Sequence, residues 1–235
     1  MSLVLNSGFT IGPGVVLNAN YTPPPPPTRY AFVFDGASCM DVTGNTGDWA
    51  FGDTGTIEFW INPDRTSAES PGGFLGAIMT QNNGGGSGID SWIAGGLAVT
   101  SGANNYGVYT EPAPNTWTHV ACVFNGIGVS PKIFLNGQQQ TLTGGQQDSG
   151  QFNNNTDSLV IGRRGSNNFQ YISAKMSDIR INTTAVYTAN FTPSAEPLTA
   201  IAGTVLLING ATLVDQTGRH TIYNAGVTVV EAGTY

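Results

Sequence analysis

Charge is scarce in this 235-residue sequence. Charged residues make up 10% of the chain, against roughly 25% in ordinary soluble domains. Asp and Glu number 15 and Lys and Arg number 8, which gives a net charge of −7. A nucleic-acid surface needs clustered cations to neutralise phosphates, and the adjacent pair Arg163-Arg164 is better explained as a surface pair at a strand end. We therefore expect no nucleic-acid partner.

Long apolar runs and cysteines are also lacking. No uninterrupted apolar stretch approaches the roughly 20 residues that a membrane-spanning helix requires, and no basic segment precedes the first apolar residues. We expect neither membrane insertion nor a cleaved signal peptide. The 2 cysteines are too few for a disulfide framework. Cys122 lies in an apolar run, which favours a buried free thiol, and a Cys39–Cys122 bridge is the alternative.

Residues 1–28 contain no Asp, Glu, Lys, Arg or His. This segment holds short apolar pieces interrupted by glycine and proline, and it ends in the run Pro23 to Pro27. Consecutive prolines lack N–H donors and form a stiff extended helix of about 3.1 Å per residue. The sequence therefore predicts an uncharged anchoring arm at residues 1–22, a spacer at 23–29 and one β domain at 30–235. Residues 200–235 supply the last strands of that domain.

Short segments of alternating apolar residues follow the prolines. In Thr56–Asn62, Ile57, Phe59 and Ile61 share one face. Two apolar runs, 116–124 and 132–135, each end in an Asn-Gly pair, a strong hairpin signal. Further strand-like runs are 30–34, 158–161, 172–182, 204–208 and 227–230. No ten-residue stretch has helical periodicity, so we predict an all-β, antiparallel β-sandwich with Phe59 and Trp117 in its core.

Several of these segments, in this order, resemble the laminin G-like, concanavalin A-like jelly-roll domains. The matching segments are Tyr30–Gly36, Gly55–Pro63, Asn115–Ala121, Lys132–Gly137, Ser158–Arg163 and Met176–Ile181. Ala185–Thr199, with 203–207 after it, looks like the end of such domains in bacteriophage virion proteins. The resemblance implies a non-enzymatic virion structural protein at the particle surface, either a capsid decoration or a tail-associated protein.

The apolar side chains of the arm are the predicted anchors to other virion proteins, through strand addition or burial against a neighbouring subunit. These residues are Leu3, Val4, Leu5, Phe9, Ile11, Val15, Val16 and Leu17. A low-charge surface with an apolar arm favours association, so we expect a homo-oligomer or a lattice-bound protein.

The alternative function is a carbohydrate-binding adhesin that recognises host glycans. Glycan binding needs an exposed aromatic platform beside amide or carboxylate groups. Three loops have this composition, with Trp92, Tyr106 and Tyr171 as the candidate rings. Each ring can also be a packed loop aromatic.

Catalysis has no support from the sequence. Glycan-cleaving jelly-roll enzymes resembling this chain carry E-x-D-x-x-E or E-x-D-x-E on one strand, whereas here Glu58 is followed by Trp60 and Asn62, and neither E-x-D nor D-x-E occurs. We predict that Glu58 lies at the surface or pairs with a cation. His119 and Cys122 fall on opposite faces of a strand, which argues against a metal site there. A glycoside hydrolase is the least favoured function.

No cofactor is required by any of these functions. The resemblance implies that a structural calcium ion can be held by Asp35 and Asp178, since jelly-roll domains of this type often bind calcium through carboxylate and carbonyl oxygens. Asp178 can instead pair with Arg180, two residues away on the same strand.

Overall fold

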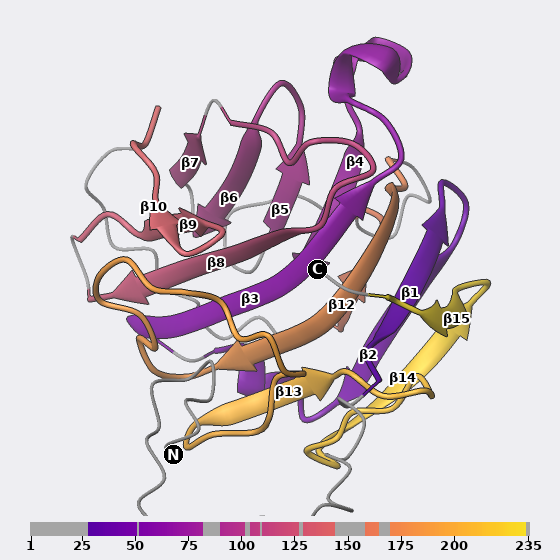
Figure 1. Cartoon of the computed structure of the whole chain (residues 1–235). Helices are drawn as coiled ribbons and strands as arrows, with labels where there is room; N and C mark the ends of the chain where they lie inside the picture. Colours follow the sequence, from indigo (N-terminus) through magenta and orange to yellow (C-terminus); the bar gives the residue numbers. More distant parts are fainter. Residues whose placement is uncertain are drawn as a thin grey trace, which may run out of the picture.

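The protein is an antiparallel β-sandwich of two sheets (Figure 1). The computed structural model describes residues 28–50, 52–81, 90–101, 104–108, 110–126, 129–143, 158–164 and 170–233. The predicted arm, with its anchoring residues, and the prolines Pro23 to Pro27 lie outside this part of the chain. The predicted all-β fold is confirmed.

Within the described residues, the first sheet has eight strands in the order β10-β9-β8-β3-β12-β1-β15, and β13 also pairs with β12. Its strands are β1 (Tyr30–Asp35), β3 (Thr54–Pro63), β8 (Thr118–Asn125), β9 (Lys132–Leu135), β10 (Gln138–Gln139), β12 (Ser173–Asn182), β13 (Thr204–Ile208) and β15 (Thr228–Glu231).

The second sheet has seven described strands in the order β14-β2-β11-β4-β5-β6-β7. They are β2 (Cys39–Gly44), β4 (Gly76–Gln81), β5 (Asp90–Ile93), β6 (Leu97–Ser101), β7 (Asn104–Val108), β11 (Leu159–Ile161) and β14 (His220–Ala225). The helical elements of the described residues are the short 3-10 turns η1 (Thr46–Trp49), η2 (Ser67–Glu69) and η3 (Pro71–Gly73). None of these helices is long and apolar enough to cross a membrane.

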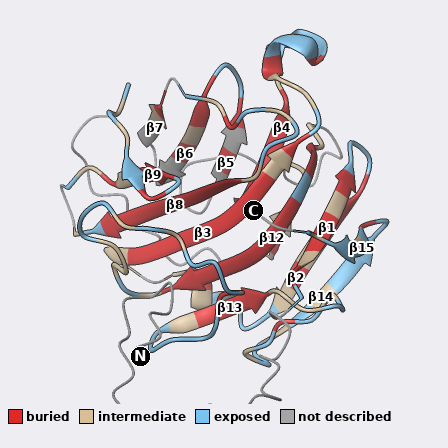
Figure 2. Ribbon diagram, in the orientation of Figure 1, coloured by how far each residue is buried: buried red, intermediate tan, exposed pale blue. Residues whose placement is uncertain are grey.

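The core lies between the two sheets and follows from the alternation seen in the sequence. Ile57, Phe59 and Ile61 of β3 are all buried in it. The intervening side chains of β3 point to the outer face of the eight-stranded sheet. That outer face is also largely buried along β3, β8 and β12 (Figure 2). Because a sheet of a sandwich usually has one face in water, something must cover this one.

The cover is the stretch between β12 and β13, residues 183–201, which we call the covering segment. It crosses the outer face of the eight-stranded sheet (Figure 1). Tyr187 and Phe191 stack with ring centroids 3.7 Å apart and pack on Phe134 of β9. The Lys132 ammonium donates to the Thr188 carbonyl at 2.5 Å. These contacts form a small second core outside the sheet.

The second Asn-Gly pair makes the tight hairpin that the sequence predicts. Asn136 and Gly137 both have positive φ, 48° and 75°, between β9 and β10. A side chain on Gly137 would overlap the Phe191 backbone, whose N–H donates to the Gly137 carbonyl at 2.9 Å. This glycine therefore serves both the turn and the close approach of the covering segment.

The predicted pairing of Asp178 with Arg180 is wrong. The register of β12 against β3 shifts between Ser177 and Arg180, and Asp178 has φ of +49°. Asp178 lies within this bulge, so the regular alternation of the strand does not hold between the two residues. Asp178 pairs with Arg29 at 2.6 Å, while Arg180 pairs with Glu58.

Two smaller sequence predictions are also settled. Cys39 and Cys122 are buried free thiols, as the first alternative has it, and burial raises the pKa of Cys122 to about 12. Trp117 was expected in the core, and this is wrong. Trp117 is only half-buried. It directly precedes β8, so the alternation of inward and outward side chains along that strand does not extend to it.

Candidate functional site

A cleft opens at the end of the sandwich where β1 and β3 stop and β12 begins. Asp35 lies opposite Ser173 there, and Pro63 lies opposite Ala174. The cleft consists of two adjoining hollows of about 620 Å³ and 450 Å³, and Asp35, Arg65 and Ser173 line both. Segments far apart in the sequence therefore build one site.

The two hollows differ in their walls. We call the larger one the aromatic hollow, because Phe74 and Tyr171 line it beside Pro71, Leu75 and Gln170. We call the smaller one the polar hollow, because it is lined by Asn62, Asp64, Asn115 and Lys175, with Val33. The polar hollow lies on the outer face of the eight-stranded sheet, beyond the covering segment.

Asp35 is exposed and its carboxylate is held by its own turn. Its Oδ1 accepts from the Ala37 backbone N–H at 3.0 Å, and its backbone N–H donates to the Ser38 hydroxyl at 3.2 Å. The Ala37 bond, followed by the Ser38 side chain, lowers the pKa of Asp35. The group is therefore an ionised acceptor at the junction of the two hollows.

Arg65 is fixed on the wall that both hollows share. Its Nε and Nη2 donate to the two carboxylate oxygens of Asp64 at 3.0 Å each, and Nη2 also reaches the Ser173 hydroxyl at 3.2 Å. The bond from Arg65 is the main reason that the pKa of Asp64 is lowered. Nη1 makes no hydrogen bond with a described residue, which leaves it available as a donor for a ligand.

The wall formed by η2 and η3 is tied down by hydrogen bonds. Glu69 accepts from both the backbone N–H and the hydroxyl of Thr66, at 2.8 and 2.9 Å, in a capping box. Glu111 accepts from the backbone N–H and hydroxyl of Ser67 at 2.7 and 2.5 Å. The loop that carries Phe74 is therefore anchored at its start.

Gln170 and Tyr171 form the opposite wall. Gln170 has φ of +59°, an uncommon conformation for a residue with a side chain, and its carbonyl accepts from the Ala77 N–H at 2.9 Å. The next residue but one, Ile172, accepts from the Gly36 N–H at 3.1 Å. At Gly76 any side chain would overlap the Ile172 backbone. These contacts fix the backbone on both sides of Tyr171.

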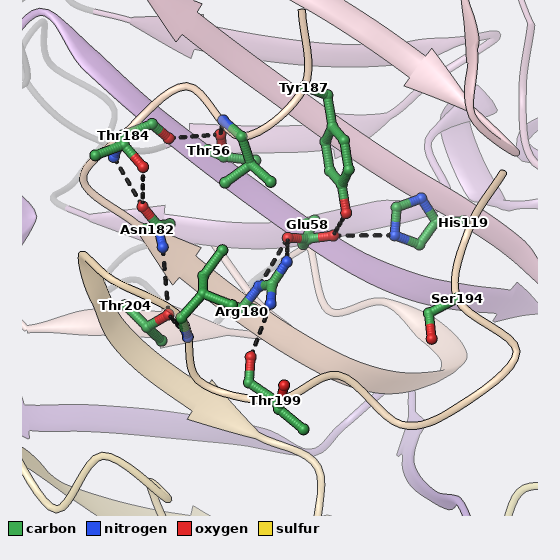
Figure 3. A network of polar contacts seen from close by, with 12 residues as sticks. Thr56, Glu58, His119, Arg180, Asn182, Thr184, Tyr187, Ser194, Thr199 and Thr204 are labelled. Carbon is green, nitrogen blue, oxygen red and sulfur yellow. Dashed lines mark hydrogen bonds and ion pairs between the residues drawn. The ribbon is translucent and has the colours of Figure 1, made fainter. Parts of the chain in front are cut away.

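Figure 3 shows a second polar cluster, which is centred on Glu58. Glu58 and Asn62 alternate on β3, so this cluster and the polar hollow lie on the same outer face of the eight-stranded sheet. Oε1 of Glu58 accepts from Nε and Nη2 of Arg180 at 2.8 and 2.5 Å. Oε2 accepts from the Tyr187 hydroxyl at 2.8 Å and lies 3.3 Å from Nε2 of His119. Each of the four residues comes from a different element: Glu58 from β3, His119 from β8, Arg180 from β12 and Tyr187 from the covering segment.

The Glu58 cluster is closed to solvent. Glu58 is 0% exposed and His119 1% exposed. Burial alone would raise the pKa of Glu58, but the contacts with His119, Arg180 and Tyr187 outweigh it and lower the pKa. Arg180 also donates to the Thr199 carbonyl at 2.7 Å, at the far end of the covering segment. The predicted cation pairing of Glu58 is confirmed, whereas its placement at the surface is wrong because the covering segment lies over it.

The sequence family described as the concanavalin A-like lectin/glucanases superfamily matches residues 35–190. The chain belongs to this superfamily. No curated protein is similar to it in sequence at a significant level.

Solved structures agree with this lectin/glucanase fold. A candidate carbohydrate-binding protein from Bacteroides ovatus is 23% identical with a TM-score of 0.61 over 88% of this chain, and this chain spans 61% of that protein's length. Domain 4 of AbnA, an extracellular arabinanase from Geobacillus stearothermophilus, solved with arabinotriose, is 14% identical with a TM-score of 0.50. That match covers 67% of this chain and 72% of the domain. At these identities the likeness shows the fold.

The lectin/glucanase fold brings two of the predicted site residues together. Tyr171, chosen as a candidate ring, and Asp35, chosen as a candidate calcium ligand, line the same hollow. Trp92 and Tyr106 belong to β5 and β7, but their side chains lie outside the described part of the structure.

Asp178 is far from this cleft. Asp35 faces Ser173 on β12, and Asp178 comes five residues later, about 17 Å away at roughly 3.3 Å per residue. One calcium ion, with ligands at about 2.3–2.6 Å, cannot bind to both. Burial raises the pKa of Asp178 to about 6, although Arg29 opposes this. Among the described residues no group of three or more His, Cys, Asp or Glu side chains is arranged for a metal. Calcium at Asp35 stays a prediction.

Sequence reasoning missed most of the cleft, including Asp64, Arg65, Phe74 and Lys175. The adjacent Asp64-Arg65 pair, directly after a strand and its Pro63, could have indicated a fixed surface turn. Nothing local to these residues indicates that residues 170–175 face them.

Proposed function

We propose that this domain binds carbohydrate in the cleft and does not cleave it. The observation that carries the proposal is the aromatic hollow, where the Tyr171 ring lies with an ionised carboxylate, Asp35, and a guanidinium fixed by its neighbours, Arg65. A sugar ring has apolar C–H faces and a rim of hydroxyls. It therefore matches a hollow that offers both an aromatic surface and charged hydrogen-bonding groups.

The expected chemistry is weak and additive. Hydrogen bonds to charged groups contribute on the order of 1.5–3 kcal/mol each before ordering costs are subtracted. Two such bonds with ring stacking give roughly 3.5–7.5 kcal/mol before those costs, so we expect dissociation constants in the millimolar range for a single sugar ring. Such a domain gains useful strength from longer glycans or from several copies.

The solved relatives support the proposal without naming a ligand for this chain. One is named as a candidate carbohydrate-binding protein, and another was solved with arabinotriose. Both share the fold of this chain. At 23% and 14% identity, no individual binding residue of either protein is assigned to this chain.

The state of three described carboxylates supports the non-catalytic part of this proposal. A glycosidase needs one carboxyl with a raised pKa as the acid and a second as base or nucleophile. In the cleft, the pKa values of Asp35 and Asp64 are both lowered. Glu58 is covered and held by Arg180. None of the three has the properties of a general acid.

A virion role remains a second proposal, and the observation that favours it is the segment without ionisable side chains at residues 1–28. We infer that the domain is displayed at a particle surface, with the arm bound to a neighbouring subunit. Deletion of residues 1–22 should abolish incorporation into particles. Normal assembly of the truncated protein would contradict this proposal, and glycan binding by the domain is independent of it.

The test of carbohydrate binding is a glycan array followed by calorimetry. We expect at least one glycan to bind, Tyr171→Ala to weaken it at least tenfold, and Asp35→Asn to weaken it about fivefold or more. Tyr223→Ala is the matched control, because Tyr223 is 62% exposed on β14, away from the cleft.

Two results would overturn the proposal. One is an array that stays blank for folded protein, and the other is equal loss of binding in Tyr171→Ala and Tyr223→Ala. Release of reducing ends from a bound glycan, lost on Glu58→Gln, would contradict the non-catalytic part.

A further inference from the structure

Among the residues that the structure describes, Lys175 is the basic side chain for which no partner is found. The chain has 8 Lys and Arg residues. Within the described residues, the other seven each donate to a protein group: Arg29 to Asp178, Arg65 to Asp64, Lys132 to Thr188, Arg163 to Asp41, Arg164 to Gln170, Arg180 to Glu58 and Arg219 to Asp48. Lys175 is exposed on β12 and makes no hydrogen bond or ion pair with a described residue.

This lysine lies in the polar hollow rather than on open surface. It faces Val33 of β1 on one side and Asn62 of β3 on the other. Asp35 is the next residue of β1 on the same face, so Asp35 and Lys175 are diagonal neighbours whose Cα atoms lie roughly 7–8 Å apart. Within the described residues no ion pair joins Lys175 to Asp35, and Asp64 is already paired with Arg65. The hollow therefore offers an uncommitted cation with amide groups beside it.

We propose that the polar hollow is a second subsite, and that it takes a sugar ring carrying an anionic group. This inference rests on the proposed carbohydrate binding and specifies its ligand class. The ammonium of Lys175 binds the anion, Asn62 donates a hydrogen bond to it, and Asp35 accepts from hydroxyls at the junction with the aromatic hollow. Both hollows have the size of small-molecule sites, roughly 300–1,000 Å³, so the cleft accommodates two adjacent rings.

The anion has two chemical sources in glycans, the carboxylate of a uronic acid and a sulfate ester. Lysine binds either one as a point charge. Asp35 lines both hollows, whereas Lys175 lines only the polar hollow, so the anion-bearing ring is assigned to the polar hollow and the neutral ring to the aromatic hollow. The ligand class is therefore an anion-bearing oligosaccharide with a neutral ring next to the charged one.

The test compares neutral, uronate-bearing and sulfated glycans on an array probed with the full chain. The tightest glycan is then converted into a neutral counterpart by carboxyl reduction or desulfation, and both forms are titrated by calorimetry. We expect the conversion to weaken binding about tenfold in the wild type, the range for a charge-assisted bond, and less than twofold in Lys175→Gln. Lys132→Gln is the control, because it also removes one lysine charge, but beside the covering segment and outside the cleft. It should keep the tenfold preference for the anionic glycan over its neutral counterpart.

Each outcome has a defined meaning. Loss on carboxyl reduction identifies a uronate, and loss on desulfation identifies a sulfate ester. Preference for neutral glycans, or equal selectivity in Lys175→Gln and the wild type, overturns this inference. In that case binding that is still abolished by Tyr171→Ala leaves the proposed function intact. Failure to bind any glycan overturns both.

Discussion

The outer face of the eight-stranded sheet has a covered region and an open region, built on the same strands. In the covered region, Glu58 of β3 and Arg180 of β12 neutralise each other beneath residues 183–201. In the open region, Asn62 of β3 and Lys175 of β12 are cross-strand neighbours that line the polar hollow. Among the described residues, no hydrogen bond joins their side chains. Polar side chains of β3 and β12 thus stabilise the fold under the covering segment. In the polar hollow, which the covering segment leaves open, polar side chains of the same strands are available to a ligand.

This contrast also separates the roles of two tyrosines. Tyr187 donates to Glu58 and stacks on Phe191, so its hydroxyl and its ring are both used by the fold. Tyr171 is held by the backbone on either side of it and lines the aromatic hollow. Changes in the covered region should therefore affect stability, and changes in the open region should affect binding.

The largest expected effect is that of Arg180→Met. It leaves the Glu58 carboxylate buried without its cation, which typically costs about 3–5 kcal/mol of folding free energy. Chemical denaturation measures this loss. Lys175→Met on the same strand is the control and should change stability by no more than about 0.5 kcal/mol. Equal effects of the two substitutions would contradict the division into covered and open regions.

Tyr187→Phe should have an intermediate effect. It removes the hydroxyl that donates to Glu58 and preserves the stacking on Phe191, so we expect a loss of about 1–2 kcal/mol. Tyr171→Phe should leave the unfolding free energy unchanged. Destabilisation of the Tyr171 variant as large as that of the Tyr187 variant would show that the cleft tyrosine is also structural.

The smallest of these effects is the pH dependence that Glu58 contributes. The pKa of Glu58 in the folded protein is below its ordinary value of 4.5, so the unfolded chain binds the proton more readily. The stabilisation is therefore complete above about pH 4.5 and is lost as the pH falls through the native pKa. Asp178, with a raised pKa of about 6, has the opposite sign and favours the folded state as the pH falls from about 6 to 4.

Thermal unfolding from pH 7 to pH 3 separates these contributions. Stability of the wild type should fall below about pH 4.5, whereas Glu58→Gln should be less stable at pH 7 and lose less on acidification. Parallel curves for the two proteins would show that Glu58 does not contribute to the acid sensitivity.

Sequence patterns predicted the fold well where local rules decide it. The alternation of Ile57, Phe59 and Ile61 located β3, and Asn136-Gly137 located the β9–β10 hairpin. The bulge at Asp178 was missed, because a single residue with positive φ leaves no trace in an alternating pattern. The strands β4 to β7 were missed as well, since glycine-rich stretches interrupt their alternation.

The candidate site was only partly predictable. Asp35 and Tyr171 were selected for different reasons, one as a calcium ligand and one as a sugar platform, and their proximity depends on β1 pairing with β12. Likewise, the partners of Glu58 come from three other segments. Such long-range pairings are set by the register of the sheet, which a single sequence does not reveal.

The measurement that tests the central proposal most directly is an NMR titration of the labelled protein with the tightest glycan from the array. We expect the backbone amides of Asp35, Arg65, Tyr171 and Lys175 to shift together, while those around Glu58 under the covering segment stay in place. Shifts confined to other surfaces, such as β14 and β15, would contradict a binding site in the cleft.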